Sequence, residues 1–567
     1  MVTIGRTDGM RVSLQSKSVR WQLYASLKLV RIVDIAIVMV TALYVSPALL
    51  AAEPGHQAGP ETQVAEKQVP AATHLFIKEY RVRGVHKLQQ IEVEEAVYPF
   101  LGADRGPEDI EQARAALEKA YQAKAYQTVS VSVPSQRGAH GIIVLQVTES
   151  PIGRLRVHGS RYFSLKRIKE AAPSLAEGGV PNFNAVTRDV VALNALPDRR
   201  ITPSLKAGVI PGTVDVDLNV QDTFPLHGSV ELNNRYSAGT TPLRLNVSAS
   251  YNNLWQLGHS LGGSIQVAPE NINDVKVFSG YYVMRFAEPS WLTLIAQGVK
   301  QESNVSTLGS IATAGRGEVI GARAIITLPP GTDFFHSITL GFDYKHFNQV
   351  TTIAAITEPA PITYYPFSAN YAATWTTKSS VTNANAGLTF NVRGPGSSAQ
   401  ELDLNRFKAD SNFVYLRSDI SHQHDLPGHF QFFGRVQGQV SDQPLVNSEQ
   451  FAGGGLGTVR GYLEAETLGD NGFAGSVELR SPSVFGSASP EANEWRFYVF
   501  VDGGYLTLID PLPEQDSAFG LASVGFGSHI RFRNHFNGSV DLAIPLISEI
   551  QTDAFDVRAT FRIWADF

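Results

Sequence analysis

The 567-residue chain contains 49 glycines, 10% aromatic residues and only 18% charged residues, and its formal net charge is −6. It has no cysteine, which excludes disulfides, thiolate metal sites and cysteine nucleophiles, and the small net charge gives no indication of nucleic-acid binding. A mean hydropathy of −0.07 is too low for a bundle of membrane helices, but it suits a transmembrane β-barrel, in which only alternate strand residues face lipid.

The N-terminus has the features of an export signal. Basic residues up to Arg31 precede an apolar run from Ile35 to Ala52, which ends in small residues suited to cleavage. We therefore predict a signal peptide over residues 1–52, with a transmembrane anchor as the alternative. Residues 53–73 are rich in Pro, Gly, Gln and Ala without periodicity, and this composition predicts a flexible linker.

An internal repeat follows the linker. The segment Tyr80–Gly84, YRVRG, recurs as Leu155–Gly159, LRVHG. Each copy begins a series of one alternating strand, two segments of helical periodicity and two further alternating strands. The pattern predicts two small β-α-α-β-β domains, over residues 74–150 and 151–225, with helices on one face of a sheet. The open edge of such a sheet can accept an extended peptide as an added strand.

Helical periodicity disappears over residues 226–567. Sixteen alternating segments of about ten residues follow one another, separated by turn residues. In the final segment, Val557 and Ile563 lie on one face, and Arg558 and Arg562 lie on the other. The even number of strands predicts a 16-stranded transmembrane barrel, with a large soluble β-sandwich or propeller as the alternative.

One segment of this region carries an isolated cation. Gly453–Tyr462, GGGLGTVRGY, has five glycines and a single arginine, Arg460. A nucleotide-binding P-loop requires Lys-Ser/Thr and a following helix, and this sequence pattern has neither. The sequence also lacks H-E-x-x-H and G-x-S-x-G motifs, so we predict no enzyme activity and no cofactor or metal site.

The motifs taken together resemble those of a known family. VRGY at Val459–Tyr462 is followed by FVDGG at Phe500–Gly504. Upstream, VPSQ at Val133–Gln136 and ALNALPDR at Ala192–Arg199 look like POTRA-domain patterns, the second of the ShlB type, in residues 151–225. The chain thus resembles the outer-membrane transporters of two-partner secretion (TpsB), the haemolysin secretion/activation (ShlB/FhaC/HecB) family, in the superfamily of the barrel-assembly protein BamA.

The resemblance implies a clasp inside the barrel. In that family VRG[YF] lies on extracellular loop six, which folds back into the lumen, and F-x-D-x-G faces inward from strand thirteen. The corresponding residues of this chain are Val459, Arg460, Gly461 and Tyr462 on the loop, and Phe500, Asp502 and Gly504 on the strand. A salt bridge between Arg460 and Asp502 is then expected to pin the loop, because a guanidinium in a partly dehydrated lumen needs a carboxylate partner.

The resemblance also implies a function and partners. It implies transport, without ATP, of a large β-helical TpsA-like exoprotein, which POTRA domains recognise unfolded in the periplasm and the barrel secretes across the outer membrane of a Gram-negative bacterium. Outer-membrane lipid, lipopolysaccharide and the barrel-assembly machinery are further expected partners of a monomer that binds no nucleic acid.

Two features of the repeats are candidates for recognising the exoprotein. The first is the second helix of the first repeat together with the edge strand beside it. The second is a set of four arginines at strand positions, Arg81, Arg83, Arg154 and Arg156. For each arginine an ordinary solvated position is the alternative.

Two other functions compete with secretion. A BamA-like insertase would share the motifs, but it normally carries more POTRA units than the two found here. A passive porin would not need N-terminal peptide-binding domains, and an outer-membrane enzyme would need a nucleophile or paired carboxylates that the sequence pattern does not offer.

Overall fold

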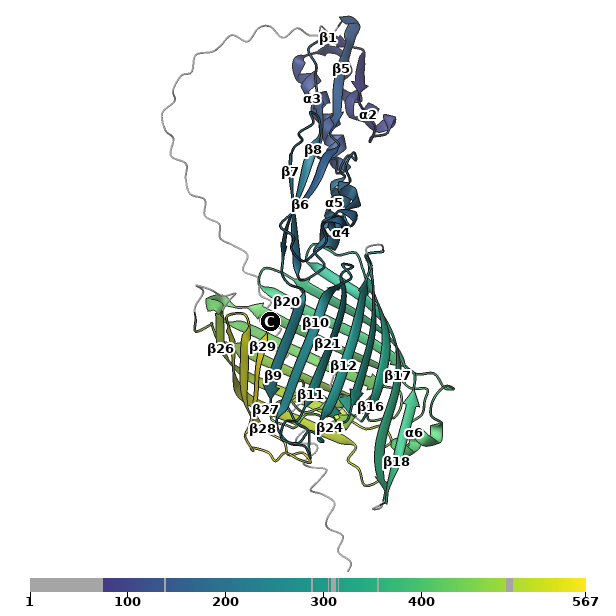
Figure 1. Cartoon of the computed structure of the whole chain (residues 1–567), viewed down its shortest axis with the longest axis vertical. Coiled ribbons are helices and arrows are strands. Elements are labelled where there is room, and N and C mark those ends of the chain that lie inside the picture. Colours follow the sequence, from purple (N-terminus) through teal and green to yellow (C-terminus); the bar gives the residue numbers. More distant parts are fainter. Residues whose placement is uncertain are drawn as a thin grey trace, which may run out of the picture. The chain divides into compact units, whose positions relative to one another are not determined.

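The computed structural model describes residues 75–136, 139–286, 289–303, 305–306, 313–314, 316–353, 356–485 and 493–567 (Figure 1). The predicted signal peptide, residues 1–52, and the predicted linker, residues 53–73, lie outside these residues. No helix within the described ranges is long and apolar enough to cross a membrane.

The first repeat has the predicted order of elements with two short strands added. Its elements are β1 (Leu75–Ile77), β2 (Glu79–Arg83), α2 (Gln90–Val97), β3 (Gly102–Arg105), α3 (Pro107–Ala123), β4 (Val129–Ser132) and β5 (Ile142–Glu149). β2 pairs in parallel with β5, and β4 pairs antiparallel with the other edge of β5. Ala113, Leu117 and Tyr121 of α3 are fully buried, as their helical spacing predicts.

The second repeat has the same sheet order. Its elements are β6 (Ile152–His158), α4 (Leu165–Glu170), α5 (Phe183–Leu193), β7 (Arg199–Ala207) and β8 (Val214–Asp222), and β8 lies between β6 and β7. Val216 and Leu218 of β8 are fully buried with Ile168 of α4 in a core separate from that of the first repeat. Each repeat therefore has its own sheet and its own core.

The repeated glycine has the same role in both units. Gly84 and Gly159 have φ angles of +82° and +86°, which favour glycine over residues with a Cβ. A Cβ on Gly84 would lie 2.3 Å from the carbonyl oxygen of Val147, and a Cβ on Gly159 would lie 2.4 Å from that of Val220. The chain can leave β2 and β6 in this direction only because the glycine has no side chain.

A carboxylate at the end of the last strand fastens the loop that follows this glycine. Glu149 Oε1 accepts the N–H groups of His86 and Lys87 at 2.8 Å. Asp222 Oδ2 accepts those of Arg161 and Tyr162 at 2.8 and 2.9 Å. Burial by itself would raise the pKa of each carboxyl, but these hydrogen bonds outweigh it and hold the pKa of both below the ordinary value.

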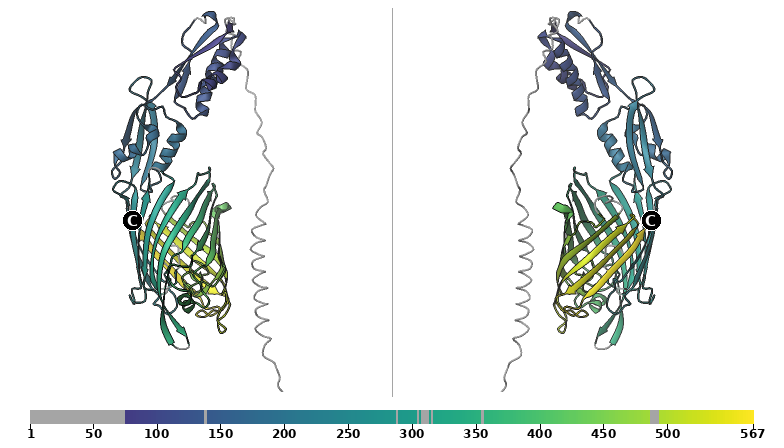
Figure 2. Two further views of the ribbon diagram at one scale, coloured as in Figure 1. Left: turned by 90° about the vertical axis from the view of Figure 1, so that its right-hand side faces the viewer. Right: turned by 90° about the vertical axis from the view of Figure 1, so that its left-hand side faces the viewer.

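The region from residue 226 onward is a closed antiparallel barrel of 16 strands, and each predicted segment forms one of them. The strands are β9 (Leu226–Asn233), β10 (Arg244–Leu254), β11 (His259–Val267), β12 (Lys276–Arg285), β13 (Leu292–Gln301), β16 (Gly317–Thr327), β17 (Phe334–Ile353), β19 (Phe367–Thr376), β20 (Ser380–Phe390), β21 (Val414–Asp425), β22 (Gln431–Ser441), β25 (Asn471–Arg480), β26 (Asn493–Thr507), β27 (Ala518–Phe532), β28 (Phe536–Pro545) and β29 (Arg558–Asp566). Figure 2 shows the tilt of these strands and the yellow strands from the end of the chain completing the barrel wall.

Closure of the barrel rests on a short pairing between its first and last strands. β29 pairs with β9 through five residue pairs, from Arg562 opposite Asn233 to Asp566 opposite Ser229. Arg562 also forms an ion pair with Glu231, with 2.9 Å between Nη2 and Oε2. Neighbouring strands elsewhere in the barrel pair over longer stretches, such as 15 residue pairs between β26 and β27.

A hairpin extends one strand of the closed wall beyond the barrel. The second half of β17 extends beyond the barrel and pairs with β18 (Ile356–Tyr364), while its first half pairs with β19. The helix α6 (Ala399–Asn405) packs against this hairpin, and Leu402 of α6 is buried with Ile362 of β18. The sequence pattern predicted neither β18 nor α6.

Inward and outward residues alternate along the wall as predicted. On β26, Val499 and Val501 are 55% and 49% exposed, whereas the side chains between and beside them, Phe500 and Asp502, are 3% and 2% exposed. The two valines therefore face lipid, and Phe500 and Asp502 face the lumen.

Candidate functional site in the barrel lumen

The segment that carries the isolated cation is the sixth connection at one end of the barrel. The chain enters the barrel at β9 directly from the second repeat, so the connections that follow β9, β11 and every second wall strand thereafter lie at the opposite end. The sixth, residues 442–470 between β22 and β25, is called loop six below. By the same count β26, which carries Phe500 and Asp502, is the thirteenth wall strand.

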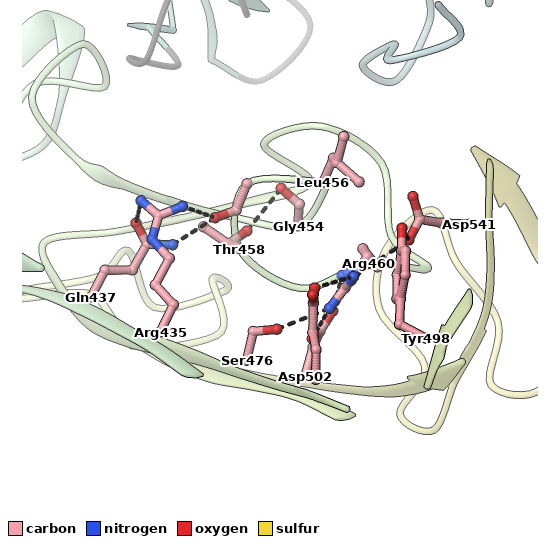
Figure 3. Close-up of polar contacts among 12 residues, drawn as sticks. Arg435, Gln437, Gly454, Leu456, Thr458, Arg460, Ser476, Tyr498, Asp502 and Asp541 are labelled. Carbon is pink, nitrogen blue, oxygen red and sulfur yellow. Dashed lines mark hydrogen bonds and ion pairs between the residues drawn. The ribbon is translucent and has the colours of Figure 1, made fainter. Parts of the chain in front are cut away.

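Arg460 of loop six is bound bidentately by Asp502. Its Nε donates to Asp502 Oδ2 and its Nη2 to Oδ1, both at 2.7 Å, and its backbone N–H donates to Oδ2 at 3.0 Å (Figure 3). Arg460 is 7% exposed and Asp502 2%. Such parallel charge-assisted bonds fix orientation as well as distance, which an ammonium group cannot do.

Two further carboxylates and a hydroxyl complete the surroundings of the guanidinium. Its Nη1 donates to Glu478 of β25 at 2.8 Å and to Asp541 of β28 at 3.4 Å, and its Nη2 donates to Ser476 Oγ at 2.9 Å. Asp541 also accepts the hydroxyl of Tyr498 at 2.9 Å (Figure 3). Sequence reasoning missed Glu478 and Asp541, although both lie at lumen-facing positions of predicted strands.

The structure gives each residue of the strand motif a contact with loop six. The guanidinium carbon of Arg460 lies 3.5 Å from the ring centroid of Phe500, within the range of a cation–π contact. A Cβ on Gly504 would lie only 3.2 Å from Cγ2 of Val459. Phe500, Asp502 and Gly504 are spaced by two residues and so point to the same face of β26.

The Phe500 ring occupies space left by a glycine on the neighbouring strand. Phe500 is opposite Gly525 of β27, and a Cβ on Gly525 would lie 2.3 Å from Cζ of that ring. The absence of a side chain at Gly525 therefore leaves room for the ring in the position where it stacks with the guanidinium.

The other loop-motif residues hold the turn after Arg460. Val459 is fully buried, and Gly461, with φ of +93°, passes close to Ala543 of β28. The hydroxyl of Tyr462 donates to the carbonyl oxygen of Ile547 at 2.8 Å and accepts the N–H of Ala522 at 3.2 Å. The VRGY segment is thus bound to residues of the barrel outside loop six.

A polar cavity of about 560 Å³ lies beside this cluster in the lumen. Its lining includes Arg435, Arg480, Arg496, Arg562, Glu494 and Asp541. The tip of loop six borders the cavity, where the Gln437 side chain donates to the carbonyl oxygen of Gly457 at 2.7 Å. The lumen therefore offers charges of both signs to a polar chain.

The four candidate arginines of the repeats lie on two strands, Arg81 and Arg83 on β2 and Arg154 and Arg156 on β6. None of them lines the lumen cavity. Arg81 pairs with Glu79 at 3.0 Å, and Arg156 pairs with Asp217 at 3.1 Å. No ion pair of Arg83 or Arg154 is found in the part of the chain that the structure describes. Because β2 and β6 belong to separate sheets, the structure does not bring the four arginines together.

The other two stretches that carried the resemblance have structural contacts of their own. The amide of Gln136, in VPSQ, bonds both the N–H and the carbonyl of Val144 on β5 and so continues the sheet beyond the end of β4. In ALNALPDR, Asp198 contacts the barrel residues His227 and Asn252.

A closed 16-stranded barrel with a polar lumen, preceded by two small helix-on-sheet units, defines the outer-membrane barrels with periplasmic POTRA domains. The model of the haemolysin secretion/activation protein family ShlB/FhaC/HecB matches residues 212–530, and the chain belongs to this family. The model of the ShlB-type POTRA domain matches residues 75–150, the first repeat, whereas the sequence patterns pointed to that type in residues 151–225. Family membership makes the chain an outer-membrane transporter and not an enzyme.

Named relatives agree with this assignment. The haem/hemopexin transporter protein HuxB of Haemophilus influenzae is 20% identical over 460 residues, which cover 80% of each chain. The structure of CdiB from Escherichia coli is similar with a TM-score of 0.64 at 18% identity, covering 98% of this chain and all of that one. BamA from Haemophilus ducreyi, lacking POTRA domains 1–3, has a TM-score of 0.52 at 12% identity, covering 87% of this chain and all of that one. At these identities the two structures show a shared fold.

Proposed function

We propose that this chain recognises one unfolded exoprotein in the periplasm through its POTRA domains and passes it through the barrel to the cell surface without ATP. The observation that carries the proposal is loop six, bound inside the lumen by the pair of Arg460 and Asp502. A folded-back loop held by side-chain bonds obstructs the channel and can be released, which suits a conduit that opens only for its client.

Recognition is assigned to an open sheet edge of the first repeat. Among the described residues, β4 has a strand neighbour on one side only, and α3 lies beside it. Arg114 of α3 donates to the carbonyl oxygen of Val131 in β4 at 3.2 Å, so a client strand would displace this single side chain. Main-chain pairing suits an unfolded client because it needs little side-chain complementarity. Of the four arginines, Arg83 and Arg154 remain the better candidates for client contacts.

The energy for transport is assigned to the client. The periplasm contains no ATP, and folding of the exoprotein outside the cell would prevent its return through the barrel. A client of large, β-helical type suits this arrangement because its fold can form progressively as the chain emerges.

Deletion of the gene tests the proposal. We expect one exoprotein to accumulate in the periplasm and other outer-membrane barrels to stay at normal levels. Depletion of many unrelated barrels would instead identify an insertase of the BamA type. A photo-crosslinking residue at Ser130 on β4 should then capture that exoprotein, whereas the same probe at Lys166, an exposed position on α4, should not.

A further inference from the structure

Loop six makes contacts at the extracellular end of the barrel that the lumen clasp does not include. Between residues 442 and 470 it contains five acidic residues and a single basic one, Arg460. The arginine binds the wall, as described above. Four of the acidic side chains, all buried or half-buried, bind the other extracellular connections or the strand ends beside them.

Glu449 binds the hairpin extension of the fourth loop. It is 2% exposed and forms an ion pair with Lys345 of β17. It also accepts the hydroxyls of Tyr364, on β18, at 2.6 Å and of Tyr415, on β21, at 2.7 Å. A carboxylate with three such partners fixes loop six to two different hairpins.

Asp470 binds the fifth and seventh loops. It is fully buried and accepts the N–H of Ile509, in residues 508–517, at 2.7 Å. Its Oδ2 also lies 3.5 Å from Nη2 of Arg406, in residues 391–413. Its Oδ1 accepts the N–H of Leu445 within loop six at 2.9 Å, so one side chain joins three loops.

Glu464 and Glu466 bind the first and eighth loops. Arg235, just after β9, donates to Glu464 at 2.8 Å from Nε and 3.2 Å from Nη2. Thr552, in residues 546–557, donates its hydroxyl to Glu466 at 2.6 Å. The first loop in turn binds the second, because Asp274 accepts the N–H of Thr241 at 2.9 Å.

From this arrangement we infer that loop six is the hub of an extracellular cap that opens and closes as one unit. Each carboxylate ties a different loop to the segment that also carries Arg460, so loop six cannot leave the lumen while its neighbours stay in place. Glu449, Glu464, Glu466 and Asp470 are positioning residues that act through loop six. The inference rests on the proposed function only in taking the barrel as a conduit.

Single-channel recording of the purified full-length chain in planar lipid bilayers tests the inference. An all-or-none cap has one open conductance, and weakening any tie changes only how often it appears. We therefore expect Glu449→Gln and Asp470→Asn to open at least about tenfold more often than the unaltered chain, at one shared amplitude, because each loses a charge-assisted buried bond. Independent loops would give each variant its own smaller amplitude.

Two additions keep the test decisive. Thr552→Val removes the side-chain bond from the eighth loop to Glu466 without changing any charge, although the N–H of Gln551 still donates to Glu466 at 3.2 Å. This variant should raise the opening frequency less than the acid variants do, at that same amplitude. Asp510→Asn is the matched control, because Asp510 is an exposed loop acid paired with exposed Lys408 at 3.3 Å. The inference would be overturned if Glu449→Gln, Asp470→Asn and Thr552→Val all opened as rarely as the control. It would also be overturned if each variant had a conductance of its own. The recording needs no exoprotein. A negative secretion assay therefore bears on the proposed function alone, and a negative recording bears on the cap alone.

Discussion

The guanidinium of Arg460 lies on the ring of Phe500, 3.5 Å from its centroid, while its two donor edges face Asp502 and Glu478. The guanidinium thus stacks on an aromatic ring with its face while it donates hydrogen bonds from its edges, and only a planar cation can do both. Arg460→Lys keeps the charge, but it should lose the forked bond and the stacking. Because the charge is kept, we expect the cost of a lost hydrogen bond to a charged group, about 1.5–3 kcal/mol, and release of the loop.

Loop release can be measured by labelling a single cysteine. The chain has none of its own, and a side chain at Gly457 would meet no atom within 4 Å. Gly457→Cys should react with an impermeant maleimide from outside the cell at least about tenfold faster when combined with Arg460→Lys, as a loss above 1.4 kcal/mol requires. Arg393→Lys, at an exposed arginine of the fifth loop, should leave the rate unchanged.

Exchanging the charges of the clasp should not restore it. In a chain with both Arg460→Asp and Asp502→Arg, the new carboxylate would lie beside Glu478 and Asp541, which now bind the arginine at 2.8 and 3.4 Å. Like charges in a partly dehydrated site repel strongly. The labelling rate of the double variant should match that of the faster single variant, and recovery to the unaltered rate would show that the surrounding acids are unimportant.

Gly525 should be intolerant of even a methyl group. A Cβ there would lie 2.3 Å from both the Phe500 ring and the carbonyl oxygen of Leu542. Gly525→Ala should therefore displace the ring, cost about 1–3 kcal/mol and lower the temperature at which the barrel loses its compact migration in detergent gels. Gly503→Ala on β26, whose Cβ would have its nearest neighbour at 3.9 Å, should change that temperature little.

The repeated glycine of the POTRA units gives a matched pair of substitutions within one unit. Gly159 and Gly178 both have positive φ, but a Cβ on Gly178 would meet nothing within 4 Å. Gly178→Ala should cost about 1–2 kcal/mol for the left-handed conformation alone. Gly159→Ala should cost more, because its Cβ would meet the carbonyl of Val220. Hydrogen exchange of β6 and β8 in the full-length protein would rank the two, and equal effects would contradict the steric argument.

The carboxylate of Asp222 should make the second POTRA unit sensitive to acid. The pKa of this group is held below its ordinary value of 3.8, so its contribution to stability is present above that pH and is lost as the pH falls through the lower folded-state pKa. Asp222→Ala should cost about 1–3 kcal/mol at neutral pH and should flatten the acid dependence of exchange protection at residues 160–163. Unchanged acid dependence in the variant would assign the sensitivity to other groups.

Sequence patterns located the wall strands well because alternation is a local property that every lipid-facing strand must have. β18 was missed because Pro359 and Pro361 interrupt its pattern, and such residues are tolerated only in a strand that pairs along one edge. The ties of loop six were missed for a different reason. Glu449 and Asp470 look like ordinary loop acids in the sequence, and their burial depends on loops that are far apart along the chain. The excess of five acids over one base in residues 442–470 was the available signal.

In each POTRA unit the loop after the repeated glycine is held by a carboxylate of the same unit, and this bears on how such chains can change in length over evolution. Glycine, loop and closing carboxylate all come from the same repeat, as Glu149 with His86 and Asp222 with Arg161 show. Neither unit borrows from the other to complete its own sheet, so a copy can be gained or lost by duplication or deletion without leaving an unclosed loop behind. The number of such units in front of a barrel of this kind is therefore not fixed by the folding of any one unit.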